Sequence, residues 1–287
     1  MQPHATAAPH TSPADLSASE RSLVERYHSR RSGWKRFARD FRSRTAPLLA
    51  RIDAFPGAVL VAGCQRSGTT MLTRLIAASG AFRRFALTHD DELDAALILA
   101  GAVTLPGEGR YCFQTTYLNE RRGEYASLRA DQRLIWVVRN PHSVVYSMVH
   151  NWRRYALEEL YQSCGRAAGE PAITRWQCLF GDGWAGKACR AYRGKAAQVF
   201  ELPGLVPPGQ LLVVDYDALV RDPADWLSRV FRFIGAPYDA ASATRVRRDS
   251  IGKSRQLSVH ERALVDTLAQ PTYEKTLALV SRAADAA

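Results

Sequence analysis

A short apolar run, a glycine-rich turn and an amphipathic stretch follow one another between residues 58 and 79. Residues 58–62 are uniformly apolar, as in a strand that is covered on both faces. Gly63 and Gly68 bracket a tight loop, and apolar residues at helical spacing then continue as far as Gly80. Strand, loop and helix in this order direct several backbone N–H groups and the positive end of the helix dipole at one point. The stretch therefore predicts a binding site for an anion.

Residues 63–70 nearly match the nucleotide-binding loop G-x-x-x-x-G-K-[ST], but Thr69 stands in place of the lysine. That lysine normally reaches the β- and γ-phosphates, so its absence argues against ordinary ATP or GTP chemistry. The nearest cation is Arg66. A charge-assisted hydrogen bond contributes about 1.5–3 kcal/mol, against about 0.3–1 kcal/mol for a helix dipole, so Arg66 should dominate the choice of anion. The alternative is a glycine turn that serves only close packing of the strand and the helix.

The composition allows one folded α/β domain and favours an anionic partner. The chain has 287 residues, 46% of them hydrophobic, which is enough to bury a full core. Its 39 basic and 28 acidic residues give a formal net charge of +11, which favours a nucleotide, an anionic membrane, a nucleic acid or a sulfated product. Charge alone does not choose among these partners.

Cysteine usage and hydropathy favour a cytoplasmic protein. The 5 cysteines are odd in number and show no C-x-x-C spacing, so the sequence predicts neither a disulfide framework nor a zinc site. No apolar run approaches the roughly 20 residues that span a bilayer, and the N-terminus lacks the apolar core of a signal peptide. We therefore expect a soluble protein in the cytoplasm.

The chain divides into a tail, a basic helical segment and an α/β domain. Residues 1–15 lack periodicity and are expected to be disordered. Residues 16–54 open with a capping box and should form one or two helices packed on the domain. The α/β domain spans residues 55–287, and its aromatic-rich part at about 152–190 should be a helical insertion, either an acceptor-binding lid or irregular packing.

The segment of residues 16–54 carries a densely basic face, which either is simply solvated or docks on a membrane surface or another anionic partner. Vesicle co-sedimentation at low and high salt would separate the two, and failure to bind anionic lipid would remove the second. The basic residues are Arg21, Arg26, Arg30, Arg31, Lys35, Arg36, Arg39, Arg42 and Arg44.

Two further strands are expected after the loop. Thr88 and Asp91 have the spacing of a capping box at the start of a helix. Residues 111–116 read as a strand, and residues 133–138 as a fully buried one. Strands that alternate with helices predict a parallel sheet, whose ligand lies beyond the carboxyl ends of the strands.

A second cation ends the strand at residues 133–138. Arg139 follows this strand, Asn140 is a plausible N-cap, Pro141 suits the first helical position and Ser143 lies in the first turn. A nucleoside triphosphatase would usually place a magnesium-binding aspartate here. Arg66 and Arg139 should therefore mark two anion sites on neighbouring strand ends, which a nucleotide with both 5′ and 3′ phosphates would bridge.

At these motifs the sequence resembles the sulfotransferases that use 3′-phosphoadenosine 5′-phosphosulfate (PAPS). Residues 63–70, Gly-Cys-Gln-Arg-Ser-Gly-Thr-Thr, are similar to the 5′-phosphosulfate loop of that family. Residues 138–143, Val-Arg-Asn-Pro-His-Ser, are similar to its 3′-phosphate motif. Residues 212–216 and 222–235 resemble its later strand and helix, and the paired motifs are much more specific than either alone.

The resemblance implies a P-loop-like three-layer α/β fold with a central parallel sheet flanked by helices. It implies metal-independent, in-line transfer of a sulfuryl group to a hydroxyl or amine, with the bisphosphate PAP as the second product. Arg66 would neutralise the charge that grows on the leaving phosphate oxygen. The implied nucleotide ligands are Gly63, Gln65, Arg66, Ser67, Gly68, Thr69 and Thr70 at the 5′ end, Arg139 and Ser143 at the 3′ end, and Lys253 and Arg255 as a cover.

A catalytic base must take the proton of the acceptor, and its expected place is near the helix that follows the first loop. Relatives use a glutamate in this region or a histidine elsewhere. Glu92 leads here and His89 is second, with Asp90 and Asp91 as further candidates. Asp91 has a sufficient structural task in capping the helix, which lowers its claim.

The sequence departs from the family at residues 111–116. Gln114 or Thr115 lies near the place where many relatives carry Lys-Thr-Pro. Either an uncharged donor acts there, or the second catalytic cation comes from elsewhere in the chain.

Two other functional classes stay open. One is a P-loop small-molecule kinase that has lost its lysine, and the other is a non-catalytic anion- or membrane-binding protein on the same fold. The acceptor, whether small molecule, glycan, lipid or tyrosyl peptide, is not fixed by the sequence, although aromatic residues between 152 and 184 favour a ring-bearing or sugar acceptor. No nucleic-acid partner and no metal are expected.

Overall fold

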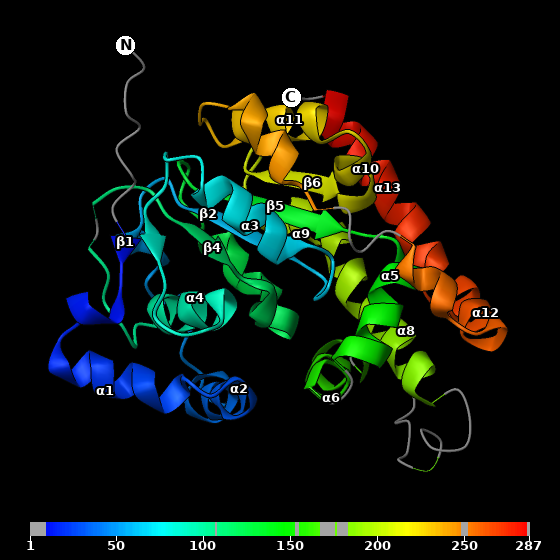
Figure 1. Ribbon diagram of the computed structural model, residues 1–287, viewed down its shortest axis with the longest axis horizontal. Coiled ribbons are helices and arrows are strands. Elements are labelled where there is room, and N and C mark those ends of the chain that lie inside the picture. The colour runs from blue at the N-terminus through cyan, green and yellow to red at the C-terminus, as the bar shows by residue number, and fades with distance from the viewer. Residues whose placement is uncertain are drawn as a thin grey trace.

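The protein is built on one central parallel sheet (Figure 1). The computed structural model describes residues 10–106, 108–152, 155–166, 176, 183–247 and 252–285. The sheet has four strands in the order β4-β2-β5-β6, and each neighbouring pair is parallel. The strands are β2 (Val59–Gly63), β4 (Cys112–Gln114), β5 (Arg133–Val138) and β6 (Leu211–Asp215).

The strands send alternate side chains into two separate cores. Val59 and Val61 belong to one core, whereas Leu60 and Ala62 belong to the other. All five residues of β2 are buried, because helices cover both faces of the sheet. The structure thus confirms the predicted strand at residues 58–62.

Helices form the two outer layers. The core that contains Val59 and Val61 is closed by α3 (Thr69–Ala77), α10 (Tyr216–Arg221) and α11 (Pro223–Phe233). The opposite core is closed by α4 (Asp91–Leu99), α5 (Pro141–Tyr146), α8 (Gly183–Ala196), α9 (Leu202–Leu205), α12 (Val259–Leu268) and α13 (Gln270–Asp285). This arrangement confirms the predicted three-layer α/β fold.

The N-terminal helices pack beside α4, at the lower left of Figure 1. They are α1 (Ala18–Tyr27) and α2 (Arg30–Phe37), and the latter continues into a π-helical turn that ends at Arg42. The expected capping box is present, since Ser17 Oγ accepts from the backbone N–H of Glu20 at 3.3 Å. Trp34 and Phe37 are buried, so α2 is part of the core.

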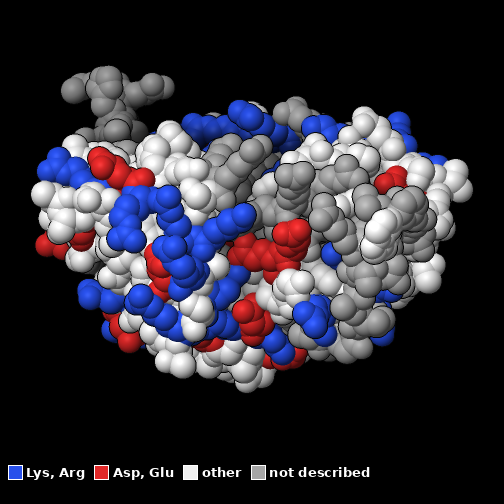
Figure 2. Space-filling view, turned by 90° about the horizontal axis from the view of Figure 1, so that it is seen from below, with Lys and Arg blue, Asp and Glu red and all other residues white. Residues whose placement is uncertain are grey.

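Basic side chains gather on the part of the lower face where α1 and α2 lie, and acidic side chains lie next to them toward the middle of that face (Figure 2). Arg26, Lys35 and Arg39 are exposed, as the predicted basic face requires. Arg42 is different: only 12% of its side chain is exposed, and it forms an ion pair with Glu159. Arg42 therefore belongs to the interior rather than to the basic face.

Part of the predicted tail is ordered. The two residues of β1 (His10–Thr11) pair in parallel with β3 (Arg84–Phe85), and Leu16 is buried. Residues 10–15 are therefore attached to the domain, contrary to the expected disorder. Residues 1–9 lie outside the described residues.

The start of α4 differs from the prediction. Asp90 is the N-cap, and its Oδ1 accepts from the backbone N–H of Glu92 at 3.1 Å. The capping box proposed for Thr88 and Asp91 is wrong, because the backbone N–H of Thr88 instead donates to Asp94 at 2.8 Å. Asp90 rather than Thr88 therefore caps α4, and Glu92 lies in the first turn of this helix.

The region expected to be a helical insertion contains α6 (Tyr155–Leu160), a π-helical turn and the start of α8. Residues 153–154, 167–175 and 177–182 lie outside the described residues, so a lid at this place stays a prediction. In the described part of the chain, no helix is both long and apolar enough to cross a membrane.

Candidate active site

The loops that follow β2 and β5 lie side by side at the carboxyl edge of the sheet. The strands are neighbours, with Gly63 opposite Val137. Arg139 Nη1 donates to the backbone oxygen of Arg66 at 3.0 Å. The structure thus brings together the two arginines that the strand pattern predicted to be close.

Arg66 has an unusual backbone and a defined orientation. Its φ is 74°, in the left-handed region that non-glycine residues seldom adopt. Its Nε donates to Ser147 Oγ at 2.8 Å, and its guanidinium lies 5.7 Å from the ring centre of Trp152. The residue is exposed, yet desolvation of its guanidinium and the charge of Arg139 both lower the pKa of Arg66. An anion that bound here would relieve both effects.

The polar groups around the two arginines suit an anionic ligand. Among the described residues, neither guanidinium forms an ion pair with a carboxylate. The Nε of Arg139 and the hydroxyl of Ser67 are buried, and neither has a hydrogen-bond partner among the residues that the structure describes. Arg139 is only 7% exposed and lies 4.4 Å above the ring of Tyr216. Buried polar groups are normally paired, so these are left available for a ligand.

The other residues of the first loop occupy different depths. The side-chain amides of Gln65 and Asn119 lie 2.8 Å apart below the loop. Thr69 is buried, and its hydroxyl accepts from Gln114 at 3.2 Å. Thr70 is exposed on the first turn of α3, beside the N–H groups that face the loop. Gln65 and Thr69 therefore support the loop, and Thr70 is open to a ligand.

The second loop has the predicted helix start and one further serine. Asn140 is the N-cap, with its side chain accepting from the backbone N–H of His142 at 2.9 Å. Ser143 lies in the first turn of α5 and is partly buried. Ser147, one helical turn further on, is the serine that contacts Arg66, which the sequence analysis missed. The sequence signal is a second hydroxyl on the same helical face as Ser143.

The basic segment at residues 252–256 packs against the second loop. Lys253 and Arg255 lie on a short 3-10 helix and are exposed. Gln256, on the same turn, accepts from the hydroxyl of Tyr146 of α5 at 2.5 Å. Both cations therefore belong to a turn held next to the helix that begins after Arg139.

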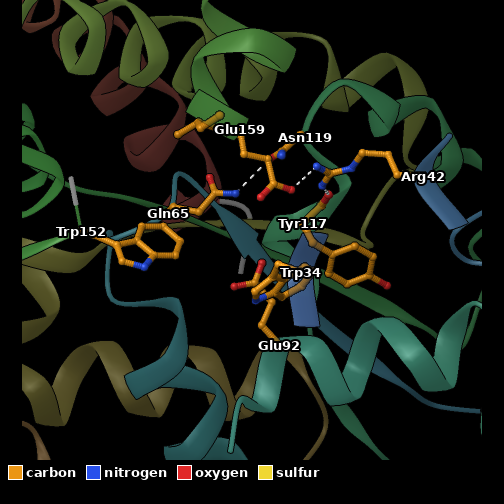
Figure 3. A pocket seen from close by; sticks show the side chains of 9 residues that line it. Trp34, Arg42, Gln65, Glu92, Tyr117, Asn119, Trp152 and Glu159 are labelled. Carbon is orange, nitrogen blue, oxygen red and sulfur yellow. Dashed lines mark hydrogen bonds and ion pairs between the residues drawn. The ribbon is translucent and has the colours of Figure 1, made fainter. Parts of the chain in front are cut away.

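A pocket that opens to solvent lies beside the first loop, with Gln65 and Trp152 among its lining residues (Figure 3). Its walls come from α2 and the turn after it, the first loop, α4, the segment that follows β4, and α6 with the residue Trp152 before it, which are far apart in sequence. Figure 3 shows the carboxyl group of Glu92 near Trp34, with Trp152 on one side and the group of Gln65, Asn119, Arg42 and Glu159 on another. Leu160 and Tyr117 complete the lining.

Of the four candidate bases, Glu92 is the one that lines this pocket. Asp90 caps α4 and accepts from the indole N–H of Trp34 at 2.9 Å. Asp91 forms an ion pair with Arg74 at 2.6 Å. His89 is exposed and lies 4.2 Å from the ring of His28.

The surroundings of Glu92 favour its protonated form near neutral pH. Desolvation of the carboxyl group is the main cause, and the charge of Asp90 adds to it, so that the pKa of Glu92 rises to about 8. The hydroxyl of Thr116 donates to one carboxyl oxygen. The amide of Gln114 donates to the other at 3.2 Å and also to Thr69, which links Glu92 to the first loop. A carboxyl group with such a pKa can accept and release a proton near pH 8.

The sequence profile described as "Sulfotransferase domain" matches residues 111–262, more than half of the chain. The chain belongs to the sulfotransferase domain family. Its parallel sheet flanked by helices is thus the P-loop-like fold of a sulfotransferase.

Solved structures of other sulfotransferases are similar to this one. Sulfotransferase STF9 from Mycobacterium avium has 13% identity and a TM-score of 0.48, over 92% of this chain and 86% of that one. Mouse sulfotransferase SULT7A1 complexed with PAP has 16% identity and a TM-score of 0.43, over 76% and 72%. Retinol dehydratase in a complex with retinol and PAP has 14% identity and a TM-score of 0.41, over 82% and 76%. No curated protein sequence matches this sulfotransferase.

The pocket of this sulfotransferase contains residues that the sequence analysis had assigned elsewhere. Trp34 lies in the segment that was expected only to pack on the domain, and Arg42 was assigned to the basic face of that segment, but both line the pocket. No sequence signal identified them, because the wall is formed only when distant segments pack together. Trp152, expected in the insertion, does lie beside the site.

Proposed function

We propose that the protein transfers the sulfuryl group of PAPS to a hydroxyl or amine of an acceptor that occupies the pocket beside Arg66. The observation that carries the proposal is the pair of guanidiniums, Arg66 and Arg139, in adjoining loops without a carboxylate partner among the described residues. PAPS would supply the reactive sulfuryl group and an anion at each end. The Ser67 hydroxyl and the Nε of Arg139, which have no hydrogen-bond partner among the described residues, fit that requirement.

Each residue would have a limited task in the transfer. Arg66 would stabilise the negative charge on the phosphate oxygen as the S–O bond breaks, and Thr70 and the N–H groups of the loop would hold the 5′-phosphate. Arg139, with Ser143 or Ser147, would hold the 3′-phosphate, and Lys253 and Arg255 would cover it. The acceptor oxygen forms the new bond to sulfur. No metal takes part in this scheme, because the cations are provided by side chains.

Glu92 would take the acceptor's proton. The carboxylate form is the active one, and with a pKa of about 8 it is a minor form at pH 7. Glu92 lines the pocket, and the guanidinium of Arg66 lies 5.7 Å from the ring of Trp152, which lines it too. A proton acceptor and a leaving-group stabiliser would thus both be next to a reacting sulfur in this pocket. His89 is the second candidate for this task.

The acceptor would carry a ring. Trp34, Tyr117 and Trp152 provide flat apolar walls, and Gln65 and Asn119 provide amides for a polar substituent. A phenolic, steroidal or sugar-like alcohol fits this lining, and the same walls accept the ring of a lipid or of a tyrosyl side chain. Contact of the basic N-terminal helices with an anionic membrane, and the cytoplasmic location, remain predictions.

Thermal unfolding with PAP, ADP and AMP, each with and without Mg²⁺, tests the donor. A ligand at 100 times its Kd adds about 2.7 kcal/mol to stability, which is a readily measured rise in Tm. We expect PAP to raise Tm equally with and without Mg²⁺. A rise that requires ADP and Mg²⁺ would indicate a kinase, and no response to any nucleotide would indicate a non-catalytic protein.

The first loop allows a sharper test at Gly68. Its φ is 95°, and a Cβ atom here would lie 2.1 Å from the ring of Tyr216. Gly68→Ala should therefore displace the loop and weaken PAP binding at least tenfold, measured by calorimetry. Gly80→Ala is the matched control, because Gly80 also has a positive φ, of 79°, but no atom lies within 4 Å of its Cβ position. Equal PAP affinity in both variants would contradict the placement of the nucleotide on this loop.

A further inference from the structure

A lysine is buried beneath the pocket. Lys195, near the end of α8, is 1% exposed, and among the described residues it forms no ion pair with a carboxylate. Its Nζ donates to the backbone oxygen of Thr116 at 3.1 Å and lies 5.5 Å from the ring centre of Trp136. Burial lowers the pKa of Lys195, so its ammonium form needs a compensating negative charge nearby to persist near pH 7.

Thr116 connects this lysine to the candidate base. The backbone oxygen of Thr116 accepts from Lys195, and also from Gln65 Nε2 at 3.2 Å. The hydroxyl of the same residue donates to the carboxyl group of Glu92. One residue therefore separates the ammonium group of Lys195 from the carboxyl group of Glu92.

The other charged groups around the pair do not replace this interaction. The thiols of Cys64 and Cys164 face Lys195, but burial raises the pKa of both thiols, so they are neutral near pH 7. Arg42 also faces Lys195 and repels it, although it is paired with Glu159. Asp90 and Glu159 face Glu92 and disfavour its charge, whereas Lys195 favours it.

We propose that Lys195 is a positioning residue of the transfer reaction: it fixes Thr116 under the pocket and supplies the positive charge that holds Glu92 ready to act as a base. This inference rests on the proposed function. Lys195 reaches the site from α8, in a region of the chain remote from the strand that ends at Gln114. Lys195 thus provides a cation beside Thr116, and residues 111–116 themselves carry none. It touches neither the donor nor the acceptor.

Two variants separate the charge of Lys195 from its hydrogen bond. Lys195→Gln retains a donor for Thr116 without the charge, and Lys195→Met removes both. The pH dependence of kcat/KM is the readout that a purely structural role would not move. Loss of a nearby opposite charge raises a carboxyl pKa by roughly one unit or more, so the ascending limb should move up by about one pH unit in both variants. At pH 7 both variants should then have a kcat/KM about tenfold lower than that of the unmodified protein. At high pH kcat/KM should recover in both, and Lys195→Met should reach the lower plateau.

Gln198→Leu is the matched control. Gln198 is buried one turn further on, and the hydrogen bond that its side-chain amide forms among the described residues is to the sulfur of Cys164. In this variant the ascending limb of kcat/KM should lie at the same pH as in the unmodified protein. An unmoved limb in both Lys195 variants would overturn the proposal.

An NMR titration tests the pair without altering Lys195 and without turnover. In the unmodified protein with ¹³Cε-labelled lysine, the signal of the solvent-protected lysine should shift near pH 8, and that step should vanish in Glu92→Gln. Absence of the step, or its persistence in Glu92→Gln, would overturn the coupling even if the Lys195 variants fail to fold. Because this readout needs no donor or acceptor, a step combined with absent sulfuryl transfer would refute the proposed reaction but leave the Lys195–Glu92 pair intact.

Discussion

Arg66→Ala is expected to lower kcat for sulfuryl transfer by about 10²- to 10³-fold, since loss of one preorganised donor at a developing negative charge has an effect of this size. The side chain is directed across the site by its bond to Ser147, and its guanidinium is partly desolvated. Electrostatic stabilisation is stronger in such an environment than in water. PAP affinity should fall much less than kcat, because Arg139 and the loop N–H groups remain. Initial rates with saturating PAPS, together with calorimetric PAP binding, measure the two effects separately.

Arg74→Ala is the control for this variant. Arg74 belongs to the helix that follows the same loop, but 67% of its side chain is exposed, and it pairs with Asp91 on the surface. Its removal should leave kcat within twofold, because exposed ion pairs contribute little. If Arg66→Ala retained more than a tenth of the native kcat, Arg66 would not be the group that stabilises the leaving phosphate.

Glu92→Gln should lower kcat by about 10²- to 10⁴-fold and leave PAP affinity unchanged, since general-base catalysis contributes this much and the amide cannot accept the proton. In the unmodified protein, kcat/KM should rise between pH 7 and pH 9 as the carboxyl group with a pKa of about 8 ionises. Asp91→Asn, at the adjacent position on the same helix, is the control. Near-normal turnover of Glu92→Gln would exclude Glu92 as the base, and His89→Ala would then be the next variant.

Glu92→Gln should also be more stable than the native protein at high pH. The folded-state pKa of Glu92 lies above its ordinary value of 4.5. The stability associated with the protonated carboxyl group is therefore fully present below about pH 4.5 and is lost as the pH rises through about 8. Glutamine carries no charge, so the Tm of Glu92→Gln should exceed that of the native protein at pH 9, by roughly 2–4 °C for each kcal/mol recovered. Equal pH dependence of Tm in the two proteins would contradict the raised pKa.

Local patterns predicted much of the fold and the position of the first anion site. The strand at residues 133–138 and the cap at Asn140 are present as expected, because an uninterrupted apolar run and an Asn-Pro pair leave few alternatives. Arg66 and Arg139 could be placed together because parallel strands end at one edge of a sheet. Each of these inferences uses residues that are close in sequence or a general property of parallel sheets.

The pocket could not be predicted in the same way. The start of α4 was predicted at the wrong residue, because three acidic residues compete to cap it. Only the packed structure shows that Asp94 accepts the hydrogen bond from the backbone N–H of Thr88. Ser147 and Trp34 were not identified as site residues, since their roles depend on which helices meet. Lys195 is the extreme case, because a lysine in a helical pattern predicts an exposed side chain.

The indole N–H of Trp34 is bonded to Asp90, the residue that caps the helix bearing Glu92. The amino-terminal helices are therefore tied to the helix that carries Glu92, the base that we propose. Deleting these helices would remove Trp34 from the wall of the proposed acceptor pocket. It would also remove the hydrogen bond to Asp90, the cap of the helix that carries Glu92. A partner that binds those helices would therefore act directly on the proposed proton-transfer step, through the hydrogen bond between Trp34 and Asp90.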